Sequence, residues 1–358
     1  MALSGNKGEW SEIYAFFKLL SDGKIHSADG RLNKIDKLFY IIKEIIRLET
    51  NVGEYNYIIQ KNSIRIAGDT KIIDIKRDEF TKYAKLLYDY IIKAQPSKGK
   101  KLSFADVEEF MNSVRCYSLK AKPQDKADIR MIIHDMRSGM EHKLGFSIKS
   151  KLGGKSTLFN SNKDTTNFLY KITGLNKEQI AEFNIQDKFA DKFDILKKYN
   201  GDITFERIVN ETFNNNLIYI DSNLPTILGH SLIEYYSNTK RSTADIIEQI
   251  SNINPCGFPD TMDFYAHKIK QMLITFALGM TSANPWSGRY DANGGYIVVK
   301  EDGDIVCYHF YDRNDLEDYL YFNTGFETPS TTRHQFGNIF EENGSFWLKL
   351  NLQIRFIH

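Results

Sequence analysis

Residues 126–150 have the pattern of two β-strands joined by a tight reversal, and no other segment constrains the fold as strongly. Apolar and polar residues alternate on both sides of a central Ser-Gly pair, which is typical of a turn. If the turn is centred on that pair, Asp128 lies opposite Lys149 and Arg130 lies opposite Ser147. These four side chains then share one face of the ribbon, because side chains alternate along a strand. The sequence predicts a hairpin with an apolar face and a charged face.

A carboxylate beside a lysine is the arrangement that a metal-dependent phosphodiesterase requires. Asp128 would bind a cation such as Mg²⁺, which prefers oxygen ligands. Lys149 would position or deprotonate the attacking water and offset the charge of the phosphorane. An ordinary half-exposed hairpin with one cross-strand ion pair has the same pattern, and such a pair contributes little stability.

Basic residues are concentrated around this hairpin. Residues 115–163 contain 11 Lys and Arg against 4 Asp and Glu, although the net charge of the 358-residue chain is only +1. Residues 164–358 are strongly acidic overall. The basic segment is therefore where a phosphate backbone is expected to lie.

The residues after the hairpin contain part of a phosphate-loop motif. A Walker A loop needs glycine five positions before Gly154, and the chain has Lys149 there, which excludes that motif. The segment favours a turn that contacts a DNA phosphate through amides and side chains, with an ordinary surface loop as the alternative. The candidate contacts are Lys151, Lys155, Ser156, Thr157 and Asn160.

Three parts of the chain resemble type II restriction endonucleases of the HpaII family. They are residues 5–12, residues 145–160 and residues 352–356, so the resemblance covers nearly the whole chain. The hairpin is also similar to the PD-(D/E)XK nuclease motif, with Asp128 as its first acid and Lys149 as its lysine. The chain departs from that motif at Ser147, where Asp or Glu is usual.

The resemblance implies a Mg²⁺-dependent endonuclease that cuts double-stranded DNA at CCGG, after the first C, and leaves 5′-phosphates. It also implies a DNA methyltransferase as functional partner, and a palindromic target favours a homodimer. Two alternatives remain: a structure-selective or nonspecific nuclease of the same superfamily, and a catalytically inactive DNA-binding protein in which Ser147 marks a decayed site.

The second metal ligand has to come from outside the hairpin, unless Ser147 acts through its hydroxyl or a bridging water. Glu9 and Glu12 lie three residues apart on a predicted helix and share a face. The resemblance implies the metal role for Glu9, because a first-helix glutamate often joins this cluster in the superfamily. A capping box with Asn6 explains Glu9 equally well. Asp135 is a further candidate if the reversal is a long loop.

Two polar loops near the C-terminus are candidates for reading bases. Arginine or lysine recognises guanine, and acids recognise the cytosine amino group. One loop contains Arg289, and the other contains Arg333, His334 and Gln335. Both lie near predicted strands, where loops often present binding residues.

Hydrophobic periodicity predicts an α+β fold with a restriction-endonuclease-like core, in which helices flank a mixed sheet. Helical segments and β-hairpins would be added for DNA recognition.

We expect helices at residues 6–20, 35–46, 80–91 and 103–117, with Ser103 as cap of the last, then successive helices over 165–280. We expect a strand pair at 64–75, hairpins around residues 302–303 and 343–344, and a helix near 315–322. Residues 1–163 would form the nuclease core, and residues 164–358 the recognition and dimerisation region.

Composition excludes several other classes. The three cysteines lie far apart without a CxxC pair, and the eight histidines form no close ligand pair, which argues against a disulfide framework or a zinc site. The sequence shows no charged leader before an apolar core and no run of membrane-spanning length. We therefore expect a cytoplasmic protein.

Overall fold

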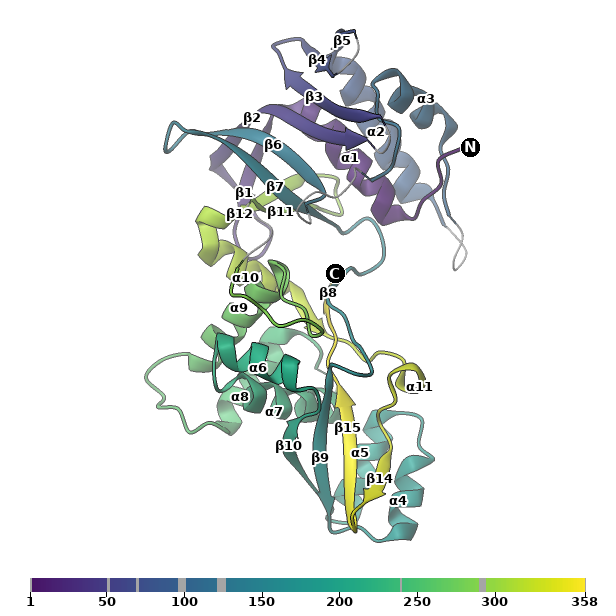
Figure 1. Ribbon diagram of the computed structural model, residues 1–358, viewed down its shortest axis with the longest axis vertical. Coiled ribbons are helices and arrows are strands. Elements are labelled where there is room, and N and C mark those ends of the chain that lie inside the picture. Colours follow the sequence, from purple (N-terminus) through teal and green to yellow (C-terminus); the bar gives the residue numbers. More distant parts are fainter. Residues whose placement is uncertain are drawn as a thin grey trace. The chain divides into compact units, whose positions relative to one another are not determined.

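The computed structural model describes residues 2–49, 52–68, 71–95, 101–120, 127–238, 240–289 and 294–357. The chain forms two units (Figure 1). The first comprises Met1–Ser156 and Asp291–Leu316, and the second comprises Thr157–Tyr290 and Glu317–His358. The expected division after residue 163 differs in two ways: the chain leaves the first unit earlier, and residues 291–316 return to it.

Described residues of the first unit form a nine-stranded mixed sheet of order β1-β12-β11-β7-β6-β2-β3-β4-β5. Strand β1 pairs with β12 and also with β2. The strands β1, β12, β11, β7, β6 and β2 therefore close into a ring. The sheet is mixed because β1–β12 and β7–β11 are parallel and the other pairs are antiparallel. The strands are β1 (Lys24–Ala28), β2 (Lys34–Glu49), β3 (Gly53–Ile59), β4 (Ser63–Ala67), β5 (Ile73–Lys76), β6 (Ile129–Asp135), β7 (Glu141–Ser150), β11 (Gly295–Val299) and β12 (Ile305–His309).

The expected helix at residues 35–46 is wrong, because this segment is strand β2. Its apolar residues recur at a helical spacing, but Ile, Phe and Tyr are residue types that favour strands. The register of β2 against β6 shifts between Ile42 and Glu44. Such a bulge interrupts the alternation of side chains, and the strand therefore lacks the period of two that would have revealed it.

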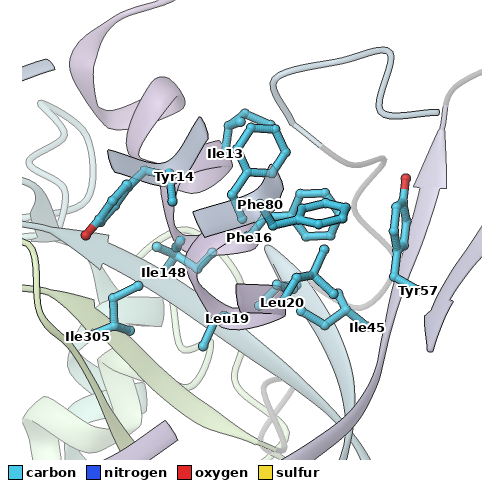
Figure 2. Close-up of a cluster of buried hydrophobic side chains, with 14 of the residues drawn as sticks. Ile13, Tyr14, Phe16, Leu19, Leu20, Ile45, Tyr57, Phe80, Ile148 and Ile305 are labelled. Atoms are coloured by element: carbon cyan, nitrogen blue, oxygen red, sulfur yellow. The ribbon is translucent and has the colours of Figure 1, made fainter. Parts of the chain in front are cut away.

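The core of the first unit lies between this sheet and its helices. These are α1 (Lys7–Asp22), α2 (Arg77–Lys93) and α3 (Ala105–Ser113). Figure 2 shows Ile13 and Phe16 of α1 in one apolar cluster with Ile45 of β2 and Ile148 of β7, and all four are buried. The expected helices at 6–20 and 80–91 are confirmed. Helix α3 corresponds to the expected helix at 103–117. It begins after Phe104, so Ser103 is not its cap.

The second unit combines helices with two small sheets, of order β10-β9-β15-β14 and β13-β16-β8. Its strands are β8 (Thr157–Phe159), β9 (Asn167–Thr173), β10 (Asp202–Ile208), β13 (Thr324–Phe326), β14 (Ile339–Glu342), β15 (Ser345–Asn351) and β16 (Ile354–Phe356). Its helices are α4 (Lys177–Asn184), α5 (Phe189–Lys198), α6 (Glu211–Ile220), α7 (Leu224–Ser237), α8 (Thr243–Ile253), α9 (Phe264–Ala277) and α11 (Thr331–His334). Helix α10 (Arg313–Asn323), which follows the 3-10 turn Phe310–Asp312, crosses the division.

Residues 165–280 are only partly helical, because β9 and β10 interrupt the expected succession of helices. Strand β9 is buried on both faces over its first four residues, so it lacks the alternation that marks a half-exposed strand. The two expected hairpins near the C-terminus are confirmed. Their turns contain Gly303, with φ +80°, and Asn343-Gly344, with φ +53° and +71°. None of the helices in the described part of the chain combines the length and the apolar character that a bilayer crossing requires.

Candidate active site

Strands β6 and β7 form the expected hairpin in a different register. Asp128 donates its backbone N–H to Phe146 O, so it lies beside Phe146 instead of Lys149. Arg130 lies opposite Gly145 instead of Ser147. Both expected pairs are therefore wrong, and the partner of Arg130 is displaced by two residues. Ser147 and Lys149 still share a face of β7, because they lie two residues apart on one strand.

Asp135 accounts for this register because it closes the reversal. Its N–H donates to Met140 O at 3.0 Å, and its carboxylate accepts from Arg137 N–H at 2.9 Å. Burial raises the pKa of Asp135, but the hydrogen bonds from Arg137 outweigh it and bring the pKa below its usual range. The reversal is short, so the long loop that would favour Asp135 as a metal ligand is not what this hairpin forms.

Asp128 lies at an irregular point just before β6. Its N–H donates to Phe146 O at 2.9 Å, although the register pairs Phe146 with Ile129. Two residues thus oppose one, which is the pattern of a β-bulge, a feature that re-aims side chains beside active sites. The Asp128 carboxylate accepts a hydrogen bond from Ile148 N–H at 2.8 Å. The bulge interrupts the alternation by which Asp128 was expected to share a face with Arg130.

Asp128 is electrostatically coupled to Glu12 of α1 and to Lys149 of β7. Burial lowers the pKa of Lys149, and the charges of Asp128 and Glu12 act in the opposite direction. Burial, followed by the charge of Asp128, raises the pKa of Glu12 to about 7. The Glu12 side chain is only 18% exposed. The structure therefore gathers two carboxylates and one ammonium in a partly desolvated site.

Tyr296 of β11 forms one wall of this site and was missed from the sequence. It pairs with Ser147 in a parallel register, and its ring centre lies 5.2 Å from Lys149 Nζ. Burial and the charge of Asp128 raise the pKa of Tyr296. The period of two after residue 294 predicts this strand, but nothing in the sequence shows that β7 is its neighbour.

Glu9 forms the capping box of α1. Asn6 N–H donates to Glu9 Oε2 at 2.8 Å, and Glu9 N–H donates to Asn6 Oδ1 at 2.9 Å. Lys120, which no sequence motif marks, has its Nζ 3.7 Å from Glu9 Oε1 and 3.9 Å from Glu12 Oε1. Asp128 influences the pKa of Glu12, whereas the Glu9 carboxylate is engaged by the helix cap. The structure thus favours Glu12 over Glu9 as the first-helix acid of the site.

The two carboxylates fit a magnesium ion. Within the described ranges, no group of three or more His, Cys, Asp or Glu side chains is arranged to hold a metal. Mg²⁺ does not require such a cage, because it is usually held by one or two carboxylates together with waters and substrate phosphates. The repulsion that helps to raise the pKa of Glu12 is also what a bound cation would relieve.

The candidate DNA contacts of residues 151–160 are divided between the units. Lys151, Lys155 and Ser156 belong to the first unit, and Thr157 and Asn160 belong to the second. Lys155 and Asn160 are exposed. Burial lowers the pKa of Lys151. The Thr157 hydroxyl accepts a hydrogen bond from Arg355 Nε at 3.1 Å, so it is engaged within the protein.

The candidate base-reading residues have different surroundings. Arg289 and Arg333 are exposed. His334 is only 8% exposed, and its Nε2 lies 3.2 Å from Ser161 Oγ, so it faces the protein interior. The expected loop around Arg333 and His334 is instead the single-turn helix α11, which ends at Gln335 with φ +53°.

Comparison with known proteins identifies the class. The chain matches the HpaII restriction endonuclease family over residues 6–356 and belongs to that family. It is therefore a restriction endonuclease, a site-specific deoxyribonuclease. The chain is 40% identical over 358 residues to the type II restriction enzyme HpaII of Haemophilus parainfluenzae, covering 99% of each protein. No solved structure matches it.

Proposed function

We propose that this protein cuts double-stranded DNA at CCGG, after the first C, in a Mg²⁺-dependent hydrolysis that leaves 5′-phosphates. One observation carries the chemistry: the charge of Asp128, at the end of the hairpin, acts on the pKa of both Glu12 and Lys149. The similarity to the HpaII enzyme over 99% of both chains supports the recognition site.

Asp128 and Glu12 would hold the cation, and Glu12 would supply the carboxylate that the motif usually has at the position of Ser147. When bound, the cation polarises the phosphate and lowers the pKa of a coordinated water. Lys149 offsets negative charge on the phosphorane, and its lowered pKa also suits it to accept a proton from the attacking water. The face of the Tyr296 ring lies near the Lys149 ammonium and positions it.

Incubating the purified protein with plasmid DNA and Mg²⁺ tests this proposal. Discrete fragments whose sequenced ends map to CCGG are expected, and EDTA should prevent cutting. A smear would identify a nonspecific nuclease. A mobility shift without cutting would identify an inactive DNA-binding protein. Asp128→Asn is the control that separates the protein's own activity from a contaminant.

The proposal also implies partners. A cell that contains this nuclease needs a DNA methyltransferase that modifies the same site, because its own unmodified DNA would be cut. A DNA substrate places the protein in the cytoplasm. A palindromic site suits a homodimer in which each chain cuts one strand.

A further inference from the structure

A polar cleft in the second unit has no part in the proposed chemistry. Its volume is about 430 Å³, and three separate segments line it. One follows β8, one joins β13 to α11, and one contains β16 and the residues beside it. Strand β16 pairs with both β13 and β8, so the three-stranded sheet holds the segments together. The polar side chains of the lining include those of Asn160, Glu327, Arg333, Gln353 and Arg355.

The guanidinium of Arg355 is held in place beside a carboxylate. Its Nε donates to Thr157 Oγ1 at 3.1 Å, and its Nη1 lies 3.9 Å from Glu327 Oε1. Glu327 is fixed in turn, because its N–H donates to Gln353 O at 3.1 Å. The Arg355 and Glu327 side chains remain 35% and 32% exposed. An ordered cation and an ordered anion are thus presented together to the cleft.

Arg333 supplies a second cation from an anchored turn. It lies on α11, where its N–H donates to Ser330 Oγ at 3.3 Å. The next residue, His334, is buried and contacts Ser161, which fixes α11 to the segment after β8. Arg333 itself is exposed, so its side chain extends from a fixed backbone toward solvent.

The combination of two arginines with one glutamate matches the edges of G·C pairs. Guanine presents the acceptors N7 and O6 in the major groove, which arginine can contact with two hydrogen bonds, and cytosine presents an amino donor that a carboxylate accepts. The charge of Glu327 would repel a phosphate, so its place in the lining favours base edges over phosphates. We propose that this cleft reads G·C base pairs, with Arg333 and Arg355 donating to guanine and Glu327 accepting from cytosine. This inference rests on the proposed cleavage of duplex DNA.

Binding of the full-length protein to short duplexes in Ca²⁺, which replaces Mg²⁺ to suppress cutting, tests the inference. One duplex carries the site at which the wild-type enzyme cuts, one carries 7-deazaguanine in place of the site guanines, and one lacks the site. Arg333→Ala should weaken binding to the site duplex about 5- to 150-fold and leave binding to the third duplex unchanged. Replacing the site guanines with 7-deazaguanine should weaken binding of the wild-type protein, because it removes N7. This replacement should weaken binding of Arg333→Ala less, because the contact to N7 is already absent in that variant.

Two further variants make the test specific. Arg207→Ala is the matched control, because Arg207 is an exposed arginine of β10 that does not line the cleft, and all its affinities should equal those of the wild type. Glu327→Gln, which keeps the shape of the side chain, should reduce the preference for the site by a similar factor without lowering the melting temperature.

The outcomes separate this inference from the proposed function. If the wild-type enzyme shows no preference for any site, both are wrong. If it prefers a site and Arg333→Ala retains the full preference and the full 7-deazaguanine penalty, the cleft does not read guanine, although the cleavage proposal stands. An equal loss of affinity for all duplexes in Arg333→Ala, as for a phosphate contact or a folding defect, also overturns the inference.

Discussion

The charge of Asp128 affects the protonation of each other group that we place in the active site. It acts on the pKa of Glu12, of Lys149 and of Tyr296, which come from three separate parts of the chain. Asp135, only seven residues away, instead stabilises the turn through Arg137. Two acids of one strand segment therefore lie in different surroundings.

Substituting these two aspartates separately tests the assignment. Asp128→Asn should lower the cleavage rate at least about 100-fold, because it removes a negative charge that acts on the reacting centre. Asp135→Asn should keep the rate and lower the free energy of unfolding by about 1 kcal/mol, through weaker hydrogen bonds to Arg137. Initial rates and denaturant unfolding measure both effects. The opposite pattern would show that the hairpin register is wrong.

Lys149 should matter for catalysis more than for binding. Lys149→Ala should reduce the cleavage rate about 100- to 1000-fold, because the ammonium acts mainly on charge that develops in the transition state. Binding to the site duplex in Ca²⁺ should change by less than about tenfold, since many other phosphate contacts remain. Lys143→Ala, an exposed lysine of the same strand, is the control and should cut normally. Near-normal cutting by Lys149→Ala would refute the active-site assignment.

The pKa of Glu12 predicts how stability depends on pH in metal-free protein. Burial, followed by the charge of Asp128, raises this pKa from 4.5 to about 7, so the folded protein binds more protons than the unfolded chain between these pH values. Stability should therefore decrease as pH rises through this window, by up to about 3 kcal/mol from this group. Denaturant unfolding in EDTA at pH 5 and pH 8 measures the difference. Glu12→Gln should reduce it, and an unchanged difference would contradict the assignment of the raised pKa.

At the scale of elements, helix α1 gives its two glutamates different roles. The capping box fixes the helix start at Asn6 and occupies Glu9, and Glu12 follows about one turn later. The helix is buried along most of its length against the sheet that carries Lys149. Glu12 is thus brought to the site by a rigid and densely packed element.

Neutralising each glutamate distinguishes capping from metal binding. Glu9→Gln should preserve cleavage and cost less than about 1 kcal/mol of stability, because glutamine also completes a capping box. Glu12→Gln should lower the cleavage rate at least about 100-fold, because it removes a charge that the cation requires. Turnover and melting temperature of both variants decide the matter. Inactive Glu9→Gln at unchanged stability would instead identify Glu9 as the ligand.

At the scale of the whole molecule, the site depends on two distant parts of the chain. The chain leaves the first unit after Ser156 and returns to it at Asp291. The returning segment contains β11, which pairs with β7 and brings Tyr296 beside Lys149. The first unit is therefore complete only when both segments are present.

One site per chain and the proposed palindromic target predict a dimer on DNA. Sedimentation velocity with the site duplex in Ca²⁺ should show two chains per duplex, because the two-fold symmetry of the DNA then matches that of the protein. A mixture of wild-type protein with excess Lys149→Ala should accumulate nicked plasmid, since a mixed dimer cuts one strand. One chain per duplex, together with cutting unaffected by the variant, would indicate a monomer that cuts the strands in turn.

Features that depend on neighbouring residues were correctly predicted from the sequence. The hairpin, the start of α1 at its capping box and the turns at Gly303 and Asn343-Gly344 each arise from interactions within a few residues. The residues that carry the family resemblance also lie in short contiguous stretches, and the family is confirmed.

Features that depend on packing between distant segments were decided only by the tertiary structure. Strand β2 has a helical spacing of apolar residues, and its three neighbouring strands make it extended. Arg137, which donates to Asp135 in the turn, also donates to Asp312 in a distant segment, so the hairpin register depends on packing as well. The raised pKa of Glu12 and the place of Tyr296 depend on burial and on charges from other elements. Local patterns record the contacts of a few consecutive residues, whereas desolvation and electrostatic coupling exist only once separate segments are packed together.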